Sequence, residues 1–376
     1  MTVVETLERL VAFDTQNPGQ VEEPCALWVA ERLRAIGAET TSDGFAPGRI
    51  NVIGTIANGP GPVFAFNTHM DVVPAGDGWS GDPFILREMG ERLVGRGACD
   101  AKGSLAAMLH AIERLSRDRS SWSGTLLGVF VADEEVSSRG AKHYAAGRPR
   151  IDYVVVGEPS GNAPIIAHKG SLRPRVHVMG RTAHSGTPDL GLNAIFQAGK
   201  LLPRLAALHE RLRGIEHPLV GSPSLTVTRA AAGIADNIVP DLCELLLDRR
   251  LVPGETEEAA LADIVAVLEQ AGEDGITAYV AGLNPTTGGP AETPPDNPIV
   301  QAALDAARRH GVGDPVPIGF QGACDFVHFR SVGAEGVVLG PGDLAVAHKP
   351  DEFVPRVALE QAVPIYCDIA LAMLGR

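Results

Sequence analysis

The sequence has little of what several large classes of protein require. Five of its 376 residues are cysteine; they are widely spaced and never form a C-x-x-C pair. An odd, scattered set of this kind argues against a disulfide framework or a cysteine-based zinc site. Positive charge is also scarce, because 32 Lys and Arg residues stand against 46 Asp and Glu residues, for a net charge of -14. A phosphate backbone needs clustered Lys and Arg, so nucleic acid is excluded as a partner.

Long apolar runs and two common catalytic motifs are missing as well. No uninterrupted apolar run approaches the roughly 20 residues of a membrane span, and the start "MTVVETLERL" lacks the basic and apolar regions of a signal peptide. We therefore expect a cytoplasmic protein without a membrane partner. No G-x-S-x-G motif of serine hydrolases occurs, and "GRGACD" lacks the third glycine of the dinucleotide-binding G-x-G-x-x-G.

The order of expected helices and strands predicts two domains, which suits 376 residues at roughly 150 per domain. In residues 1–169 and 285–376, continuous apolar strands alternate with amphipathic helices, as in a mostly parallel sheet covered by helices. Residues 170–284 instead follow the order β-α-β-β-α-β of a ferredoxin-like unit. We predict an α/β domain interrupted by an inserted ferredoxin-like α+β domain.

Acidic residues and histidines follow nearly every strand that we expect in the first domain. Because functional crevices lie beyond the carboxyl ends of parallel strands, these side chains are expected to meet at one edge. A single strand-end Asp or Glu is usually a solvated loop residue or a helix cap, and a single histidine is usually a surface residue. The repetition at strand after strand favours a shared polar site. Its candidate members are His69, Asp71, Asp100, Glu134, Glu135, Glu158 and His348.

The chemistry of this set predicts two metal ions. Histidine and carboxylate ligands without cysteine suit zinc, with cobalt and manganese as alternatives. Two histidines and three carboxylates exceed the roughly three protein ligands of one catalytic zinc, so we expect two ions that share a bridging aspartate. Such a pair activates a bridging water. One glutamate of the Glu134 and Glu135 pair then remains free to act as a general base.

Seven segments in order carry a family resemblance. They are "NTHMDVVP", "GRGACDAKGSLAAM", "ADEEVSSRGA", "VVGEPS", "GRTAHSGTPDLGLNAI", "DNIVP" and "AHKPDEFV". With these motifs the chain resembles the family of di-zinc metallopeptidases and amidohydrolases that includes acetylornithine deacetylase, succinyl-diaminopimelate desuccinylase, aminoacylase and glutamate carboxypeptidase. The resemblance extends over essentially the whole chain. It implies an enzyme that hydrolyses an amide bond.

The resemblance also implies a role for each candidate in the metal centre. His69 and Glu158 would complete the first zinc, Glu135 and His348 the second, and Asp100 would bridge the two ions. Asp71 would orient the imidazole of His69. Glu134 would then be the general base.

Further roles implied by the resemblance fall in the inserted domain. His184 would stabilise the oxyanion, usually in the active site of the partner subunit. Arg250 and Asn237 would contact the carboxylate and the reacting carbonyl of the substrate, and Arg is well suited to bind a carboxylate with two hydrogen bonds. Without the resemblance, all three would be taken for ordinary surface residues. The same resemblance implies that residues 1–169 and 285–376 form the metal-binding catalytic domain. It also implies that residues 170–284 serve as a lid and dimerisation domain, through which the protein forms a homodimer.

The substrate class is left with alternatives. Glu158, where some relatives carry Asp, resembles the deacylase and carboxypeptidase branches, so we expect hydrolysis of an N-acyl amino acid of the deacetylase or desuccinylase type. A carboxypeptidase or dipeptidase is the alternative. A non-catalytic small-molecule binding protein is a third reading, which the intact ligand set and Glu134 argue against. Cys324 departs from the Ser or Thr of many relatives and affects the expected shape of the substrate pocket, while Cys99 is an unfavourable nucleophile beside Asp100.

Overall fold

The computed structural model describes residues 1–375 and separates into two compact units. The smaller unit comprises Ala167–Glu292 together with Phe320–Ala323, and the larger unit comprises the rest of the described chain. The division therefore lies at 166/167 and 292/293, a few residues from the 169/170 and 284/285 expected from the sequence. The difference arises because residues expected to be a linker form strand β13 (Ala291–Glu292), which pairs with the second half of β8 (Ile165–His168).

The largest sheet is mixed and has the strand order β1-β2-β6-β3-β7-β15-β8-β13, and β14 pairs with β8. Its strands from β1 to β15 in this order lie in the larger unit. Its four central strands run parallel, whereas the strands at both edges are antiparallel. A smaller three-stranded sheet has the order β16-β5-β4. The strand bounds not yet given are β1 (Glu39–Ala46), β2 (Arg49–Asn58), β3 (Val63–His69), β4 (Arg87–Met89), β5 (Arg92–Val94), β6 (Gly124–Val131), β7 (Tyr153–Val156), β14 (Ile318–Phe320), β15 (Glu335–Val338) and β16 (Phe353–Pro355).

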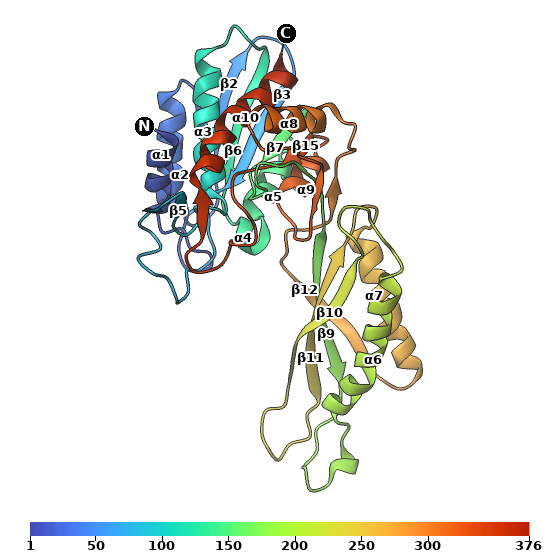
Figure 1. Ribbon diagram of the computed structural model, residues 1–376. Coiled ribbons are helices and arrows are strands. Elements are labelled where there is room, and N and C mark those ends of the chain that lie inside the picture. The colour runs from blue at the N-terminus through green and yellow to red at the C-terminus, as the bar shows by residue number, and fades with distance from the viewer. Residues whose placement is uncertain (376) are drawn as a thin grey trace. The chain divides into compact units, whose positions relative to one another are not determined.

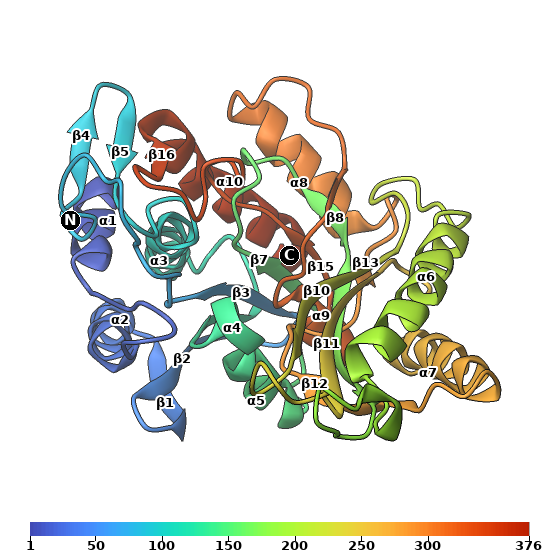
Figure 2. The same cartoon turned by 90° about the horizontal axis from the view of Figure 1, so that it is seen from below.

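Helices cover both faces of this sheet, so the α/β class predicted from the sequence is confirmed (Figures 1 and 2). Figure 2 shows α3 and α10 on one side of β3 and α5 on the other. The helix bounds are α1 (Val3–Val11), α2 (Glu23–Ala35), α3 (Lys102–Arg117), α4 (Glu134–Ser137), α5 (Arg139–Ala146), α8 (Pro298–Arg309), α9 (Phe326–Ser331) and α10 (Arg356–Leu374).

The core of the larger unit forms where β3 meets α10. Phe64 and Phe66 are two residues apart on β3 and so face the same side of the sheet, with ring centroids 5.0 Å apart. Phe66 packs at 5.5 Å against Tyr366 of α10, whose hydroxyl donates to the carbonyl of Leu339 at 2.8 Å. Each such buried aromatic ring contributes about 1.5–3 kcal/mol relative to an exposed one. This packing fixes β3, and with it the position of His69 at its end.

Helix α10 also satisfies a length and composition test for a membrane span. Half of its most apolar 18-residue window is nevertheless buried inside the larger unit, where the helix packs against α3 and α8. A buried core helix passes the same test, so this feature on its own is weak support for a membrane-spanning segment.

The smaller unit has the order β-α-β-β-α-β, with an antiparallel sheet arranged β10-β11-β9-β12. Its elements are β9 (Gly170–Met179), α6 (Ala194–Leu212), β10 (Ser224–Ala232), β11 (Leu242–Leu251), α7 (Glu257–Glu273) and β12 (Ala278–Asn284). Both helices lie on one face of the sheet (Figure 1). Alternate residues of β11, including Leu245 and Leu247, are fully buried and share a core with Leu201 and Ile264 of the helices.

Candidate active site

Four parallel strands of the larger unit end at one edge of the sheet and deliver most of the candidate residues there. His69 is the last residue of β3, and Glu158 lies two residues beyond β7. Glu134 and Glu135 open the short helix α4 that follows β6. Asp100 lies in the turn before α3, and His348 lies in the loop that follows β15. The parallel arrangement is the reason why residues far apart in the sequence meet here.

Asp100 lies at the centre of the cluster, between the two histidines. Its Oδ1 is 3.3 Å from Nε2 of His69, and its Oδ2 is 3.2 Å from Nε2 of His348. The same nitrogen of His348 is 3.2 Å from Oε2 of Glu135, and that of His69 is 3.8 Å from Oε1 of Glu158. The cluster therefore has two arms, each with one histidine and one glutamate, that share the carboxylate of Asp100. Ligand atoms of His69, Asp100 and Glu135 all lie within 4.8 Å of one another.

Asp71 touches His69 mainly through its main chain. Nδ1 of His69 donates to the Asp71 carbonyl at 2.9 Å, while the Asp71 Oδ1 atom is 3.6 Å away. The Asp71 carboxylate instead accepts from the backbone N–H groups of Glu134 at 3.0 Å and Glu135 at 3.1 Å. Asp71 thus fixes His69 by its carbonyl and the two adjacent glutamates by its side chain. The second of these functions was not predicted from the sequence.

Asn17 completes this arrangement and was also missed by the sequence analysis. Its Nδ2 donates to Oδ2 of Asp71 and to Oδ1 of Asp133, both at 2.9 Å. Asp133 has a left-handed backbone with φ of 65°, a conformation that Asp tolerates better than most residues. Asn17 therefore holds Asp71 and the residue before Glu134 together. The only signal in the sequence was the turn-forming Asn-Pro-Gly at residues 17–19, which does not indicate a long-range contact.

The electrostatics of the cluster are those of a site built for cations. Burial raises the pKa of Glu134 and of Glu158 well above the usual range, and raises that of Glu135 to about 7 with help from the Asp100 charge. Hydrogen bonds to Asp100 and Glu135 raise the pKa of His348 to about 10. The carboxyl groups of the cluster thus outnumber its two imidazoles, and burial without a bound cation disfavours their charged forms. Convergent imidazole and carboxylate donors of this kind fit divalent metal ions, whose charge would favour the ionised carboxylates.

Two further buried residues adjoin the glutamates. Asp325, from the "QGACDF" segment, is buried, and burial raises its pKa to about 6. Burial is the largest cause of the raised pKa of Glu134, and the negative charge of Asp325 is the second largest. Burial also raises the pKa of the Cys324 thiol well above its usual range, and Glu158 adds to this shift. Cys324 was singled out in the sequence, but Asp325 was not, because a single Asp at a helix start carries no distinctive pattern.

The remaining three candidates lie in the smaller unit. His184 is exposed, and its Nδ1 accepts from the Gly186 N–H at 3.0 Å. Asn237 lies in the adjoining segment, because its carbonyl accepts from the Ser185 N–H at 2.9 Å. Arg250, near the end of β11, pairs with Asp248 at 2.7 Å. The structure thus places His184 and Asn237 in neighbouring segments and Arg250 elsewhere in the same unit.

The sequence of the chain matches one protein family over most of its length. The model of Peptidase family M20/M25/M40 matches residues 65–372. The chain therefore belongs to this family, and the resemblance inferred from its motifs is confirmed. It is an enzyme of the metallopeptidase and amidohydrolase type that acts on a non-ester C–N bond.

Individual relatives support the same assignment. An acetylornithine deacetylase from Myxococcus xanthus is 31% identical over 385 aligned residues, which cover 96% of this chain and 97% of that one. The chain also resembles the structure of an M20 family metallo-carboxypeptidase from Sulfolobus solfataricus, with a TM-score of 0.80, 20% identity and coverage of 100% and 99%. A dinuclear metal binding peptidase of the family from Bacillus subtilis gives a TM-score of 0.75 at 19% identity, with coverage of 99% and 97%. At these identities the two structures establish the shared fold.

Proposed function

We propose that this protein hydrolyses the amide bond of an N-acyl amino acid with the help of two divalent metal ions, most simply zinc. The observation that carries the proposal is the position of Asp100, whose two oxygens face His69 and His348 on opposite arms of the cluster. The similarity to acetylornithine deacetylases over nearly the whole chain supports an acyl amino acid as the substrate.

The five metal ligands divide between the two arms. His69, Glu158 and Asp100 would hold one ion, and His348, Glu135 and Asp100 would hold the other. Bound there, two divalent ions would lower the pKa of a shared water and stabilise developing negative charge on the substrate oxygen.

Glu134 is the base in this proposal. It lies next to the ligand Glu135, and burial together with the Asp325 and Glu158 charges raises its pKa well above the usual range. A carboxylate with a raised pKa accepts a proton from the attacking water more readily and can then return it to the leaving amine. The backbone N–H of Glu134 donates to Oδ1 of Asp71 at 3.0 Å, which fixes the position of the Glu134 main chain.

The residues of the smaller unit would act on the substrate. Because Nδ1 of His184 accepts a hydrogen bond from the Gly186 N–H, its ring proton lies on Nε2, which can donate to an oxyanion. Asn237 would donate to the reacting carbonyl. Arg250 would bind the substrate carboxylate, and the ion pair with Asp248 restricts its side chain.

The substrate class is tested by amine release. Metal-loaded protein is assayed with N-acetylornithine, other N-acetyl and N-succinyl amino acids, and a matched set of dipeptides. We expect faster release from an N-acyl amino acid than from any dipeptide. Faster cleavage of dipeptides would replace the deacylase by a peptidase of the same family.

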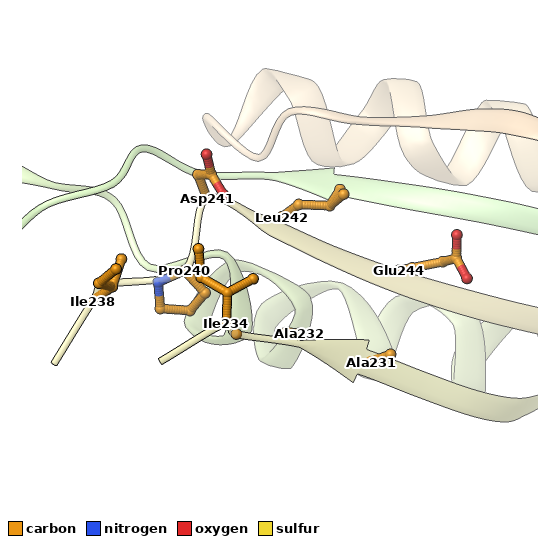
Figure 3. Close-up of a pocket in the computed structure, with 9 residues that line it drawn as sticks. Ala231, Ala232, Ile234, Ile238, Pro240, Asp241, Leu242 and Glu244 are labelled. Carbon is orange, nitrogen blue, oxygen red and sulfur yellow. The ribbon is translucent and has the colours of Figure 1, made fainter. Parts of the chain in front are cut away.

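We further propose a homodimer formed by the smaller unit. Strand β10 is an edge of its sheet. Large apolar side chains are exposed on helix α6, which packs against β10, and just after β10: Phe196 is 70% exposed and Ile234 is 85% exposed. Ile234 and Pro240 line a pocket of about 300 Å³ at the end of β10, and Figure 3 shows both side chains there. An exposed edge strand with apolar neighbours suits pairing with a second copy of the chain.

A cytoplasmic location is proposed as well. All five cysteines, although buried, are free thiols, as is usual in a reducing compartment.

A further inference from the structure

The turn that carries Asp100 is held by a carboxylate from more than 250 residues further along the chain. Oε1 of Glu352 accepts from the backbone N–H groups of both Cys99 and Asp100, each at 2.9 Å. The carbonyl of Glu352 accepts from the N–H of Gly95 at 2.9 Å. Glu352 therefore fastens the turn at its start and at the residue whose side chain joins the two arms of the metal cluster.

Arg96 supplies the opposite charge for this carboxylate. Its Nη1 is 2.5 Å from Oε2 of Glu352, and both residues are 1% exposed. Its Nη2 donates to the carbonyl of Ala75 at 3.2 Å, in the loop that follows His69. Its Nη1 also approaches the carbonyl of Lys349, the residue after His348, at 3.4 Å. The pair thus connects the loops next to His69 and His348 with the turn that carries Asp100.

A contribution to stability alone does not explain this arrangement well. A buried ion pair loses so much hydration that well-packed apolar residues often stabilise a fold equally well. The contacts made by Glu352 and Arg96 instead go to the backbone beside three predicted metal ligands. Groups that hold metal ligands in place typically change metal affinity by about 10–100-fold when they are removed.

We propose that Glu352 is a positioning residue for Asp100, and that Arg96 positions Glu352 and the loops beside His69 and His348. Glu352 orients Asp100 through the backbone N–H groups of residues 99 and 100. This inference rests on the proposed metal centre, and its test measures metal binding without turnover.

Two double variants separate the hydrogen-bond acceptor from the ion pair. Arg96→Met with Glu352→Gln removes both charges but keeps an oxygen that can accept from the two N–H groups. Arg96→Met with Glu352→Leu removes both charges and the acceptor. Thr293→Val is the stability control, because it deletes a buried hydrogen bond of 2.7 Å to the Gly336 carbonyl, outside the metal cluster. The affinity of metal-free protein for cobalt is measured against a competing chelator, together with the cobalt absorption spectrum and the unfolding temperature.

The expected result is a cobalt affinity about 10–100-fold weaker for the leucine variant, with an altered cobalt spectrum. Thr293→Val should keep the wild-type affinity and spectrum, even where the unfolding temperature falls. The glutamine variant lacks the Arg96 contacts but keeps the acceptor, so its affinity should lie between those of Thr293→Val and the leucine variant, and an affinity equal to that of the leucine variant would refute the role of the acceptor. Wild-type affinity and spectrum in the folded leucine variant would refute the proposal. So would a loss of affinity in Thr293→Val as large as that in the leucine variant.

Glu352→Asp decides the matter if the leucine variant does not fold. It keeps the charge opposite Arg96 but withdraws the acceptor by one methylene, so weaker cobalt binding is expected, and unchanged binding would refute the positioning role. A wild-type protein that binds no cobalt would overturn the metal centre and this inference together. Tight cobalt binding without amide hydrolysis would overturn only the proposed substrate.

Discussion

The same substitution at the adjacent residues Glu134 and Glu135 should affect two different properties, turnover at Glu134 and metal content at Glu135. The backbone N–H groups of both residues donate to the Asp71 carboxylate, so Asp71 fixes the main chain at both positions. Only Glu135 contacts a histidine of the cluster, at 3.2 Å from His348. Glu134→Gln should therefore abolish most of the turnover while leaving metal content unchanged, and Glu135→Gln should reduce metal content.

The size of the effect follows from the role assigned to each residue. A positioned general base contributes about 10²–10⁴-fold to the rate, equivalent to about 3–5.5 kcal/mol in the activation barrier. Glutamine matches the shape of Glu134 but cannot accept the proton, so kcat should fall by this factor with KM nearly constant. Replacing one carboxylate ligand by a neutral amide in Glu135→Gln removes a charge from one arm of the cluster, so about one ion per chain should be lost or weakly held.

Two assays read out this prediction. The amine released at saturating substrate gives kcat, and elemental analysis of the dialysed protein gives the number of ions bound per chain. Wild-type kcat in Glu134→Gln would refute its role as the base. Loss of metal from Glu134→Gln with full retention in Glu135→Gln would show that the two roles are exchanged.

Three further changes test other parts of the account. Asp71→Asn replaces one of the two carboxylate oxygens that accept from the Glu134 and Glu135 N–H groups by an NH2 group, which can only donate. Metal affinity, measured by chelator competition, should therefore fall about 10–100-fold. Unchanged affinity would contradict the anchoring role. Burial raises the pKa of Glu22 from 4.5 to about 7 in the folded protein, with Asp71 adding to the shift. The folded state therefore holds this proton more tightly, and stability is lost as pH rises from about 4.5 to about 7. Glu22→Gln cannot lose this proton, so between pH 4.5 and about 7 the unfolding free energy of the variant should rise relative to that of the wild type by up to about 3 kcal/mol. If denaturant titrations gave the same pH dependence of the unfolding free energy for both proteins, the assignment would be refuted. Phe196→Glu should convert the dimer to a monomer in analytical ultracentrifugation, whereas Ile85→Glu, at a residue 60% exposed in the larger unit, should not; a wild-type monomer would refute the dimer.

The central strands along the chain, and the polar residues that follow them, could be predicted because both are local features of the sequence. Apolar runs such as residues 62–69 and 152–158 specify buried strands, and parallel strands must end at a common edge. The meeting of His69, Glu135 and Glu158 follows from that geometry, whereas Asp100 lies in the turn between β5 of the three-stranded sheet and α3. The assignment of Glu135 to a ligand role came from the resemblance, since spacing alone did not distinguish it from Glu134.

The residues that hold the site were not predictable from sequence pattern. Asn17, Arg96 and Glu352 act through hydrogen bonds that span 21 to 256 residues, and no periodicity or local motif encodes such partners. The way in which Asp71 contacts His69 is a related case. The backbone geometry turns the Asp71 carbonyl toward the imidazole and leaves the carboxylate for the glutamates.

The most direct test of the two-metal hydrolase is to titrate metal-free protein with zinc and to follow, in the same samples, the bound zinc per chain and the rate of amine release from the preferred N-acyl amino acid. The rate should be negligible in the metal-free protein and reach its maximum when two ions are bound per chain. Full activity in the metal-free protein, or a maximum with no second ion bound, would contradict the account.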